Sequence, residues 1–139
     1  MSRLRGWVWG VLVIALTVTA SGCGDNQKVT NDLKRIGLAY HDYCDSTRKA
    51  PTGPKDLEPY YERDAKLTQA LDSGQYVFYW NVRIEDMIKG AGTSNTVIAY
   101  EKDVPTKGGL VLIGDTSVRR MTAQEFAQAP KATPPGKKD

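Results

Sequence analysis

The chain has 139 residues, of which 40% are hydrophobic and 25% are charged, so we expect one globular domain with a single core. It contains 19 basic and 16 acidic residues, and residues 23–139 alone contain 17 basic and 16 acidic residues. A balance this even predicts no clustered basic face, so nucleic acid is excluded as an expected partner.

The amino-terminal segment has the pattern of a secretory signal peptide. Arg3 and Arg5 give it a basic start, residues 7–20 are almost entirely apolar, and the small residues Ser21 and Gly22 follow. A helix that spans a bilayer needs about 20 apolar residues, so this run is short for a permanent anchor. We therefore expect residues 1–22 to be removed as a signal peptide.

The end of this apolar run, Ala20-Ser21-Gly22-Cys23, resembles the lipobox of bacterial lipoproteins. The resemblance implies cleavage just before Cys23 and a diacylglyceryl group on its thiol, after which the new amine can be acylated. Ala20 is a departure, because the family usually has Leu at this position. A plain signal peptide cut at Ala20 or Gly22 and an uncleaved anchor are the alternative interpretations.

Acylation would decide where the whole chain is located. Two acyl chains suffice for stable attachment, since each buried methylene contributes about 0.8 kcal/mol. We expect a lipoprotein of the cell envelope, anchored to a membrane through Cys23, with its domain on the extracytoplasmic side. Cys44 is then the one remaining thiol, so no intramolecular disulfide is expected, and no cofactor is expected besides the covalent lipid.

The mature chain begins with a polar segment and continues with its strongest periodicity. Residues 23–28 are mostly small and polar and are expected to form a lipidated linker. Apolar residues then recur at spacings of four and three, which predicts a helix over about residues 26–47. This stripe consists of Val29, Leu33, Ile36, Tyr40 and Tyr43. Cys44 lies beside the stripe and is predicted to be a small buried core residue.

The rest of the chain predicts shorter elements. Pro51 and Pro54 end the long helix, and Thr122 with Glu125 matches a capping box. Residues 83–89 favour neither helix nor strand. We expect an irregular turn over 55–61, a helix over 62–72, strands over 75–82, 96–102, 110–114 and 117–121, a helix to about 128 and a disordered tail over 129–139.

This order of elements predicts an α+β domain over residues 29–128. A long amino-terminal helix must bury its apolar stripe, and the sheet is the only large apolar surface that the sequence predicts. We therefore expect the helix to pack on a small antiparallel sheet of three to four strands.

Two segments are similar to segments of pseudopilin-like bacterial families. Residues 31–43 (NDLKRIGLAYHDY), followed by Ala50-Pro51, are similar to the families' Asn-Leu-Lys-x-Ile-Gly-Leu-Ala helix and the proline after it. Residues 108–118 (GGLVLIGDTSV) resemble their Gly-Gly pair, apolar strand and Asp-Gly-Ser-Val hairpin. The resemblance implies a pseudopilin-like fold over about residues 26–126.

The chain also departs from the pseudopilin pattern. Pilin-type proteins keep an apolar leader helix with a Glu near its start, whereas here that segment is the predicted signal peptide and lacks the Glu. The families' His ahead of Gly108 is missing. Thr116 replaces Gly in the hairpin, and because Thr tolerates positive φ poorly we expect no tight type I′ turn. We therefore expect a pseudopilin-like domain that serves as a lipid-tethered module and not as a filament subunit.

No constellation of residues predicts an active site. His41, the only histidine, is expected to face solvent while Cys44 faces the core, which disfavours a metal or Cys–His site. A Ser-His-Asp arrangement stays open because folding could assemble it, although no nucleophile-elbow motif is present. A calcium site formed by loops, as in some pseudopilins, is a further alternative, although the sequence contains no EF-hand spacing. Its ligands would come from the carboxylates of Glu85, Asp86, Glu101, Asp103 and Asp115.

Aromatic residues alternate along the first predicted strand. Tyr76, Phe78 and Trp80 share one face, and Val77 and Tyr79 share the other. Packing of both faces into the core is the favoured interpretation. If aromatic side chains are exposed, Tyr76, Phe78 and Trp80 form a candidate surface for a protein or glycan partner.

The sequence predicts a non-enzymatic role. The favoured hypothesis is a membrane-tethered binding or scaffolding module of the cell envelope, with an envelope protein as its partner. The alternative hypothesis is a small envelope hydrolase that uses His41.

Overall fold

The computed structural model describes residues 23–137. The predicted signal peptide and residues 138–139 lie outside the described residues. Within the described range the fold is α+β, as predicted, with a long first helix and a four-stranded antiparallel sheet. The helices are α1 (Cys23–Thr47), α2 (Pro54–Leu57), the 3-10 helix η1 (Glu58–Tyr61), α3 (Ala65–Asp72), α4 (Ile84–Lys89), α5 (Val104–Lys107) and α6 (Ala123–Gln128). The strands are β1 (Tyr76–Phe78), β2 (Val97–Glu101), β3 (Gly109–Ile113) and β4 (Val118–Met121).

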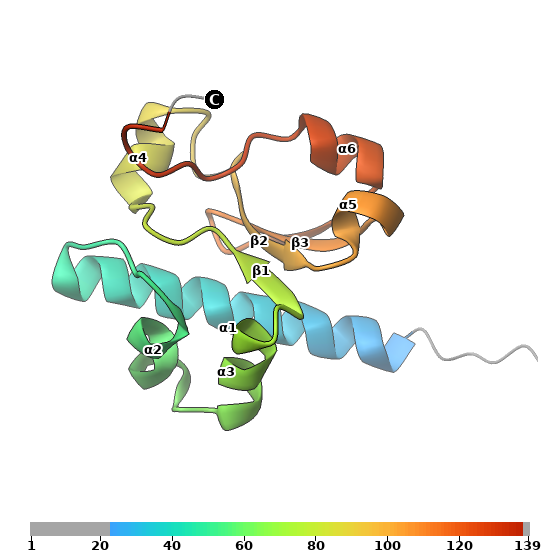
Figure 1. Ribbon diagram of the computed structural model, residues 1–139, viewed down its shortest axis with the longest axis horizontal. Coiled ribbons are helices and arrows are strands. Elements are labelled where there is room, and N and C mark those ends of the chain that lie inside the picture. Colours follow the sequence, from blue (N-terminus) through green and yellow to red (C-terminus); the bar gives the residue numbers. More distant parts are fainter. Residues whose placement is uncertain (1–22, 138–139) are drawn as a thin grey trace, which may run out of the picture.

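The elements form layers around α1 and the sheet. Figure 1 shows α2 and α3 on one side of α1 and the sheet on its other side, while α5 and α6 lie beyond the sheet. The contacts agree, because α1 touches α2, η1, β3 and β4, and α5 and α6 touch each other and the sheet. The long helix is therefore enclosed from two sides.

The strands follow one another in the sheet in the order β1-β2-β3-β4, each antiparallel to the next. The β3–β4 hairpin is closed by Thr116 N–H, which donates to the Ile113 carbonyl at 2.9 Å. Of the turn residues only Thr116 has positive φ, at 72°. A type I′ turn needs positive φ at both central residues, here Gly114 and Asp115, so no such turn forms. The reason for expecting this is wrong, however, because Thr116 itself adopts positive φ.

The main core forms where α1 faces the sheet and the small helices. The predicted stripe residues Leu33, Ile36 and Tyr40 are at most 1% exposed, and Cys44 is buried beside them. A Cβ added at Gly37 would lie 3.0 Å from Leu112 Cδ1, so Gly37 lets the helix approach β3 closely. Each buried aliphatic or aromatic side chain of this size contributes roughly 1.5–3 kcal/mol.

A second core lies on the opposite face of the sheet. It contains Val97, Val104, Val111, Ile113 and Phe126, so α5 and α6 cover the sheet face that α1 leaves free. Both faces of the sheet are therefore packed, and buried residues follow one another without alternation through β3.

The predicted linker is wrong, because α1 begins at Cys23 and residues 23–28 are helical. No proline interrupts this segment, and an Asp25 carboxylate in the first turn interacts favourably with the helix dipole. The Lys28 ammonium lies 2.6 Å from Asp32 Oδ2, one turn further along. The polar composition of residues 23–28 suggested a linker, but none of these residues prevents the helix from extending back to Cys23.

Several predicted boundaries also shift for local reasons. The predicted helix over 62–72 begins at Ala65, because Glu62 and Arg63 have positive φ and the Asp64 side chain accepts hydrogen bonds from the next turn. The predicted strand over 75–82 ends at Phe78. The undecided segment 83–89 forms α4, and the predicted capping box of Thr122 and Glu125 is present at α6.

The predicted disordered tail is also wrong over its first part. Val97 N–H donates to the Pro130 carbonyl at 2.8 Å, and Ala132 N–H donates to the Val97 carbonyl at 2.9 Å. Ala132 is buried. Because β1 ends at Phe78, residues 130–132 occupy the place beside the start of β2 that a longer β1 would have filled.

We predict that a chain ending at Ala129 is less stable than one ending at Pro134. The shorter chain loses both backbone hydrogen bonds to Val97 and the burial of Ala132. We expect its free energy of unfolding to fall by about 1–3 kcal/mol. Urea unfolding followed by circular dichroism measures this difference, and equal midpoints for the two truncated chains would contradict it.

We predict that the Asp64 carboxylate makes folding stability depend on acid pH. The hydrogen bond from Arg35, 2.8 Å away, lowers the pKa of Asp64 below its usual value of 3.8. A carboxylate with a depressed pKa stabilises the fold above its unfolded pKa, and this contribution is lost as pH falls below about 4. Asp64→Asn should therefore flatten the acid side of the stability profile measured by urea unfolding, whereas Asp42→Asn, at an exposed position, should leave that profile unchanged.

Candidate functional site

The predicted lipidation site, Cys23, is the first residue of α1. Residues 20–22 of the lipobox lie outside the described residues, and of Cys23 the structure describes only the backbone. From Cys23 the helix runs without interruption to Leu33, which is fully buried. A group attached at Cys23 would therefore be joined to the core by continuous helix.

The first turns of α1 are fixed to the end of the sheet. Arg120 of β4 donates from its guanidinium to the Asn26 side chain at 2.9 Å. The Tyr76 hydroxyl at the start of β1 donates to Asp32 Oδ2 at 2.8 Å, and burial followed by this contact raises the Tyr76 pKa. These contacts hold the amino-terminal part of the helix against both edge strands.

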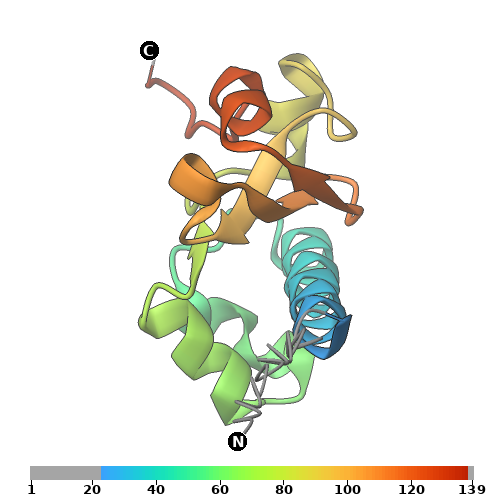
Figure 2. The same cartoon turned by 90° about the vertical axis from the view of Figure 1, so that its right-hand side faces the viewer.

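A polar hollow lies beside these turns. It has a volume of about 370 Å³, and its charged lining residues are Glu101, Lys102, Asp103, Lys107 and Arg120. Asn26, Gln75, Gly108 and Gly109 complete the lining. These residues come from the start of α1 and from one end of the sheet, where β1 and β3 begin and β2 and β4 end, which Figure 2 views end-on. The sequence gives no sign of the hollow, because its residues are brought together by folding.

Gly108 and Gly109 shape one wall of this hollow. Gly108 has φ 71°, and a Cβ added to it would lie 2.7 Å from the Met121 carbonyl oxygen. A Cβ added to Gly109 would lie 2.7 Å from Glu101 Oε2. Side chains at these positions would need a strained backbone and would displace the end of β4 or the Glu101 carboxylate.

His41, the candidate catalytic residue of the alternative hypothesis, is engaged in the fold. Its Nε2 lies 2.6 Å from the Gly114 carbonyl oxygen in the β3–β4 turn. A carbonyl oxygen only accepts, so Nε2 carries the proton and donates. The ring also packs edge-on against Tyr40. This hydrogen bond joins α1 to the hairpin and makes Nδ1 the acceptor nitrogen of the neutral ring. Over residues 23–137, no Ser, Thr or Cys side chain hydrogen-bonds to His41, so the residue has no nucleophile beside it.

Cys44 is buried, as predicted, and lies in the main core. Burial raises the pKa of its thiol, and burial likewise raises the pKa of the neighbouring Tyr40 hydroxyl. Tyr40 donates to the Val82 carbonyl at 2.9 Å. Because the thiolate is the reactive form of cysteine, this environment suits a core residue and not a nucleophile.

The candidate partner surface is wrong for two of its three residues. Tyr76 and Phe78 are 1% and 6% exposed, since their face of β1 packs on α1. Tyr79, on the other face, packs against the second core, so the favoured interpretation that both faces are packed is confirmed.

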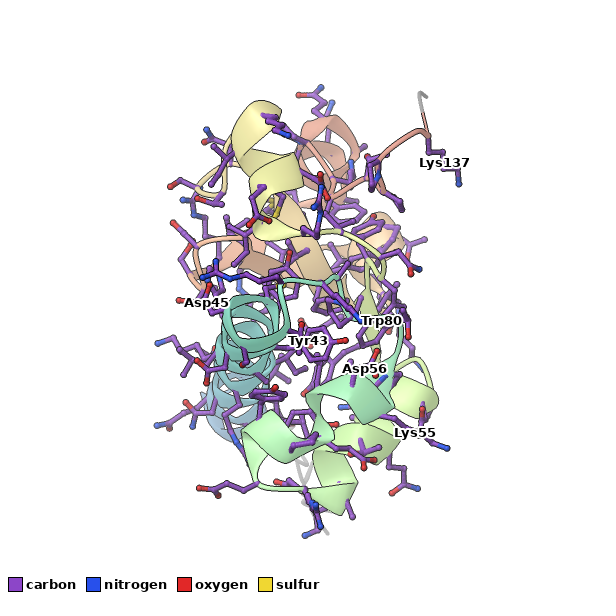
Figure 3. All side chains as sticks on the ribbon, turned by 90° about the vertical axis from the view of Figure 1, so that its left-hand side faces the viewer. Tyr43, Asp45, Lys55, Asp56, Trp80 and Lys137 are labelled. Atoms are coloured by element: carbon purple, nitrogen blue, oxygen red, sulfur yellow. The ribbon has the colours of Figure 1, made fainter. Side chains whose placement is uncertain are left out.

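Trp80 is half-buried, 4.3 Å from the Phe78 ring between centroids. The residues after Trp80 lie beside the carboxy-terminal part of α1, because Asn81 N–H donates to the Pro51 carbonyl and the Tyr40 hydroxyl donates to the Val82 carbonyl. Figure 3 labels Trp80 in the view from that end of the domain.

The carboxylates proposed for a calcium site do not come together. Asp86 pairs with Arg83, whose hydrogen bond lowers the Asp86 pKa, while Asp115 accepts hydrogen bonds from Ser117. Glu101 Oε2 accepts from Leu110 N–H at 2.7 Å. Over residues 23–137, no three His, Cys, Asp or Glu side chains are grouped closely enough to hold a metal ion.

Comparison with known proteins identifies no relative. No family model, no curated protein and no solved structure matches this chain. In the part of the chain that the structure describes, no helix is long and apolar enough to cross a bilayer.

We predict that His41 contributes to stability through its hydrogen bond. His41→Ala leaves the Gly114 carbonyl without this donor, and the free energy of unfolding should fall by about 1 kcal/mol. His41→Gln keeps an N–H donor and should lose less. Urea unfolding compares both variants with Asp42→Ala, an exposed control on the same helix; a loss for Asp42→Ala as large as that for His41→Ala would contradict the assignment.

Proposed function

We propose that this protein is a lipoprotein of the bacterial cell envelope, anchored to a membrane through acylated Cys23, whose domain binds or scaffolds another envelope component. The observation that carries the proposal is the lipobox-like sequence directly ahead of Cys23, after a basic start and an apolar run. The domain then lies on the extracytoplasmic side.

The start of α1 supports this proposal. The helix begins at Cys23 and enters the core without a break, so the proposed anchor and the domain form one rigid unit. A flexible linker would let the domain move freely above the membrane, whereas this arrangement keeps one end of the sheet close to the bilayer. Such an attachment suits a module that presents its opposite end at a fixed height.

The environment of His41 favours binding over hydrolysis. Its Nε2 donates to the Gly114 carbonyl, and its ring packs on Tyr40. A hydrolase that used His41 would need a nucleophile beside the other ring nitrogen, Nδ1, and in the described part of the chain no Ser, Thr or Cys side chain hydrogen-bonds to His41. The contacts that His41 makes are explained by a structural role, which is to join α1 to the β3–β4 hairpin.

The resemblance to pseudopilin-like domains supports a scaffolding role. Gly37 and the Gly108-Gly109 pair belong to the segments that carry the resemblance, and each occupies a position at which a side chain would clash with the fold. The partner surface would lie away from the membrane, where Trp80 keeps part of its ring accessible. Tyr and Trp are enriched in such contacts because they combine apolar area with a polar group.

We predict that Cys23→Ser releases the protein from membranes. Without the thiol no diacylglyceryl group is attached, and the apolar contribution of about 0.8 kcal/mol per buried methylene is lost. Fractionation of cells, with intact-mass measurement of the purified product, checks both attachment and lipid.

Cys44→Ser is the matched control, because it removes the other thiol and leaves the lipobox unchanged. This variant should stay in the membrane fraction with its lipid mass intact. Wild-type protein that begins at a residue other than Cys23, or that lacks the lipid mass, would contradict the anchor.

The scaffolding part of the proposal has its own test. Cross-linking of intact cells, followed by affinity purification of the wild type and of Trp80→Ala, should identify an envelope protein that the wild type captures and the variant captures less. Equal capture by both proteins would exclude the Trp80 end as the partner surface.

A further inference from the structure

We propose that the polar hollow beside the start of α1 binds the phosphate of a zwitterionic phospholipid headgroup, so that this end of the domain lies directly on the bilayer. The inference rests on the proposed acylation of Cys23 and goes beyond it, because it assigns a lipid-binding site to the folded domain. The hollow is lined by Asn26, the charged ends of β2 and β4, and the last residue of α5.

The position of Asn26 relative to the anchor brings the hollow to the right depth. Asn26 follows Cys23 by three residues of helix, a rise of about 4.5 Å at about 1.5 Å per residue. The polar layer on each side of a bilayer is about 5–7 Å thick. An anchor at Cys23 therefore places Asn26, and the Arg120 side chain that contacts it, at the level of the headgroups.

The hollow lies at a fixed position relative to the first residue of α1. The helix has no interruption between Cys23 and the buried core, and Arg120 and Tyr76 attach its first turns to β4 and β1. Loops joined to a lipid by a flexible linker would sample many heights, but these strand ends keep a fixed distance from the first residue of the helix.

The lining charges suit a phosphate. Lys102, Lys107 and Arg120 supply ammonium and guanidinium donors at exposed positions. The Glu101 carboxylate already accepts from Leu110 N–H inside the fold, which reduces its competition for these cations. Lys107 lies 3.6 Å from Asp103, an exposed pair of the kind that contributes little and exchanges readily for a phosphate.

The acidic groups nearby select among phospholipids. Asp25 lies on the first turn of α1, and Asp103 lines the hollow, so this end of the domain has no strong positive field. Long-range attraction to an anionic surface is therefore weak. A zwitterionic headgroup fits better, because its phosphate can meet Arg120 and Lys107 while its ammonium meets Asp103.

Lysine footprinting on the full lipoprotein tests the proposal. The purified protein is reconstituted into vesicles of phosphatidylcholine, whose quaternary ammonium does not react, isolated by flotation and treated with an amine-acylating reagent. Lys102 and Lys107 should react about fivefold more slowly in vesicles than in maltoside micelles. Lys49 and Lys55, exposed residues outside the hollow, should react equally in both.

Variants separate headgroup binding from simple shielding. Lys107→Gln, which leaves the Arg120–Asn26 contact intact, should restore much of the Lys102 reactivity in vesicles, whereas Arg48→Gln, an exposed change at the other end of α1, should not. Equal unfolding midpoints for the two variants would show that the difference does not arise from unfolding.

The outcomes distinguish this inference from the proposed anchor. Protein that neither floats with the vesicles nor carries a lipid mass would refute the acylation of Cys23. Protein that floats, but in which Lys102 and Lys107 react as fast as in micelles, would overturn the headgroup site alone. Full protection of the micellar protein by inorganic phosphate would also overturn it, because the hollow would then bind free phosphate.

Discussion

The fold depends on the enclosure of α1 between the sheet and the small helices. Leu33, Ile36 and Tyr40 are buried, and α1 contacts α2 and η1 on one side and β3 and β4 on the other. Gly37 lets the helix approach Leu112, and the Tyr40 and His41 hydrogen bonds to Val82 and Gly114 fix its rotation and register. A change on this helix therefore affects both halves of the domain.

Much of this arrangement is readable from the sequence, because it rests on local patterns. The spacing of apolar residues in 29–43 predicts the helix and its buried face, and the capping box at Thr122 predicts the start of α6. In each case the residues that set the structure are neighbours in the chain.

The features that the sequence did not predict depend on contacts between distant segments. Residues 130–132 look disordered in composition, but they pair with Val97 because β1 stops at Phe78 and leaves the start of β2 open. Tyr76 and Phe78 could face a partner by alternation alone, and the packing of α1 decides that they are buried. The hollow at the start of α1 combines the ends of separate strands, so no single segment carries its signature.

The continuity of α1 links these observations to the proposed role. Helix geometry fixes how far each element lies from Cys23, and the hydrogen bonds of Arg120 and Tyr76 prevent the first turns from bending away from the sheet. With Cys23 acylated, the ends of β2 and β4 face the bilayer and the end that holds Trp80 faces away from it. The lipid would then set both the location and the orientation of the domain. Under the proposed function, a short helical connection would present the same face of the domain to a partner more consistently than a flexible linker would.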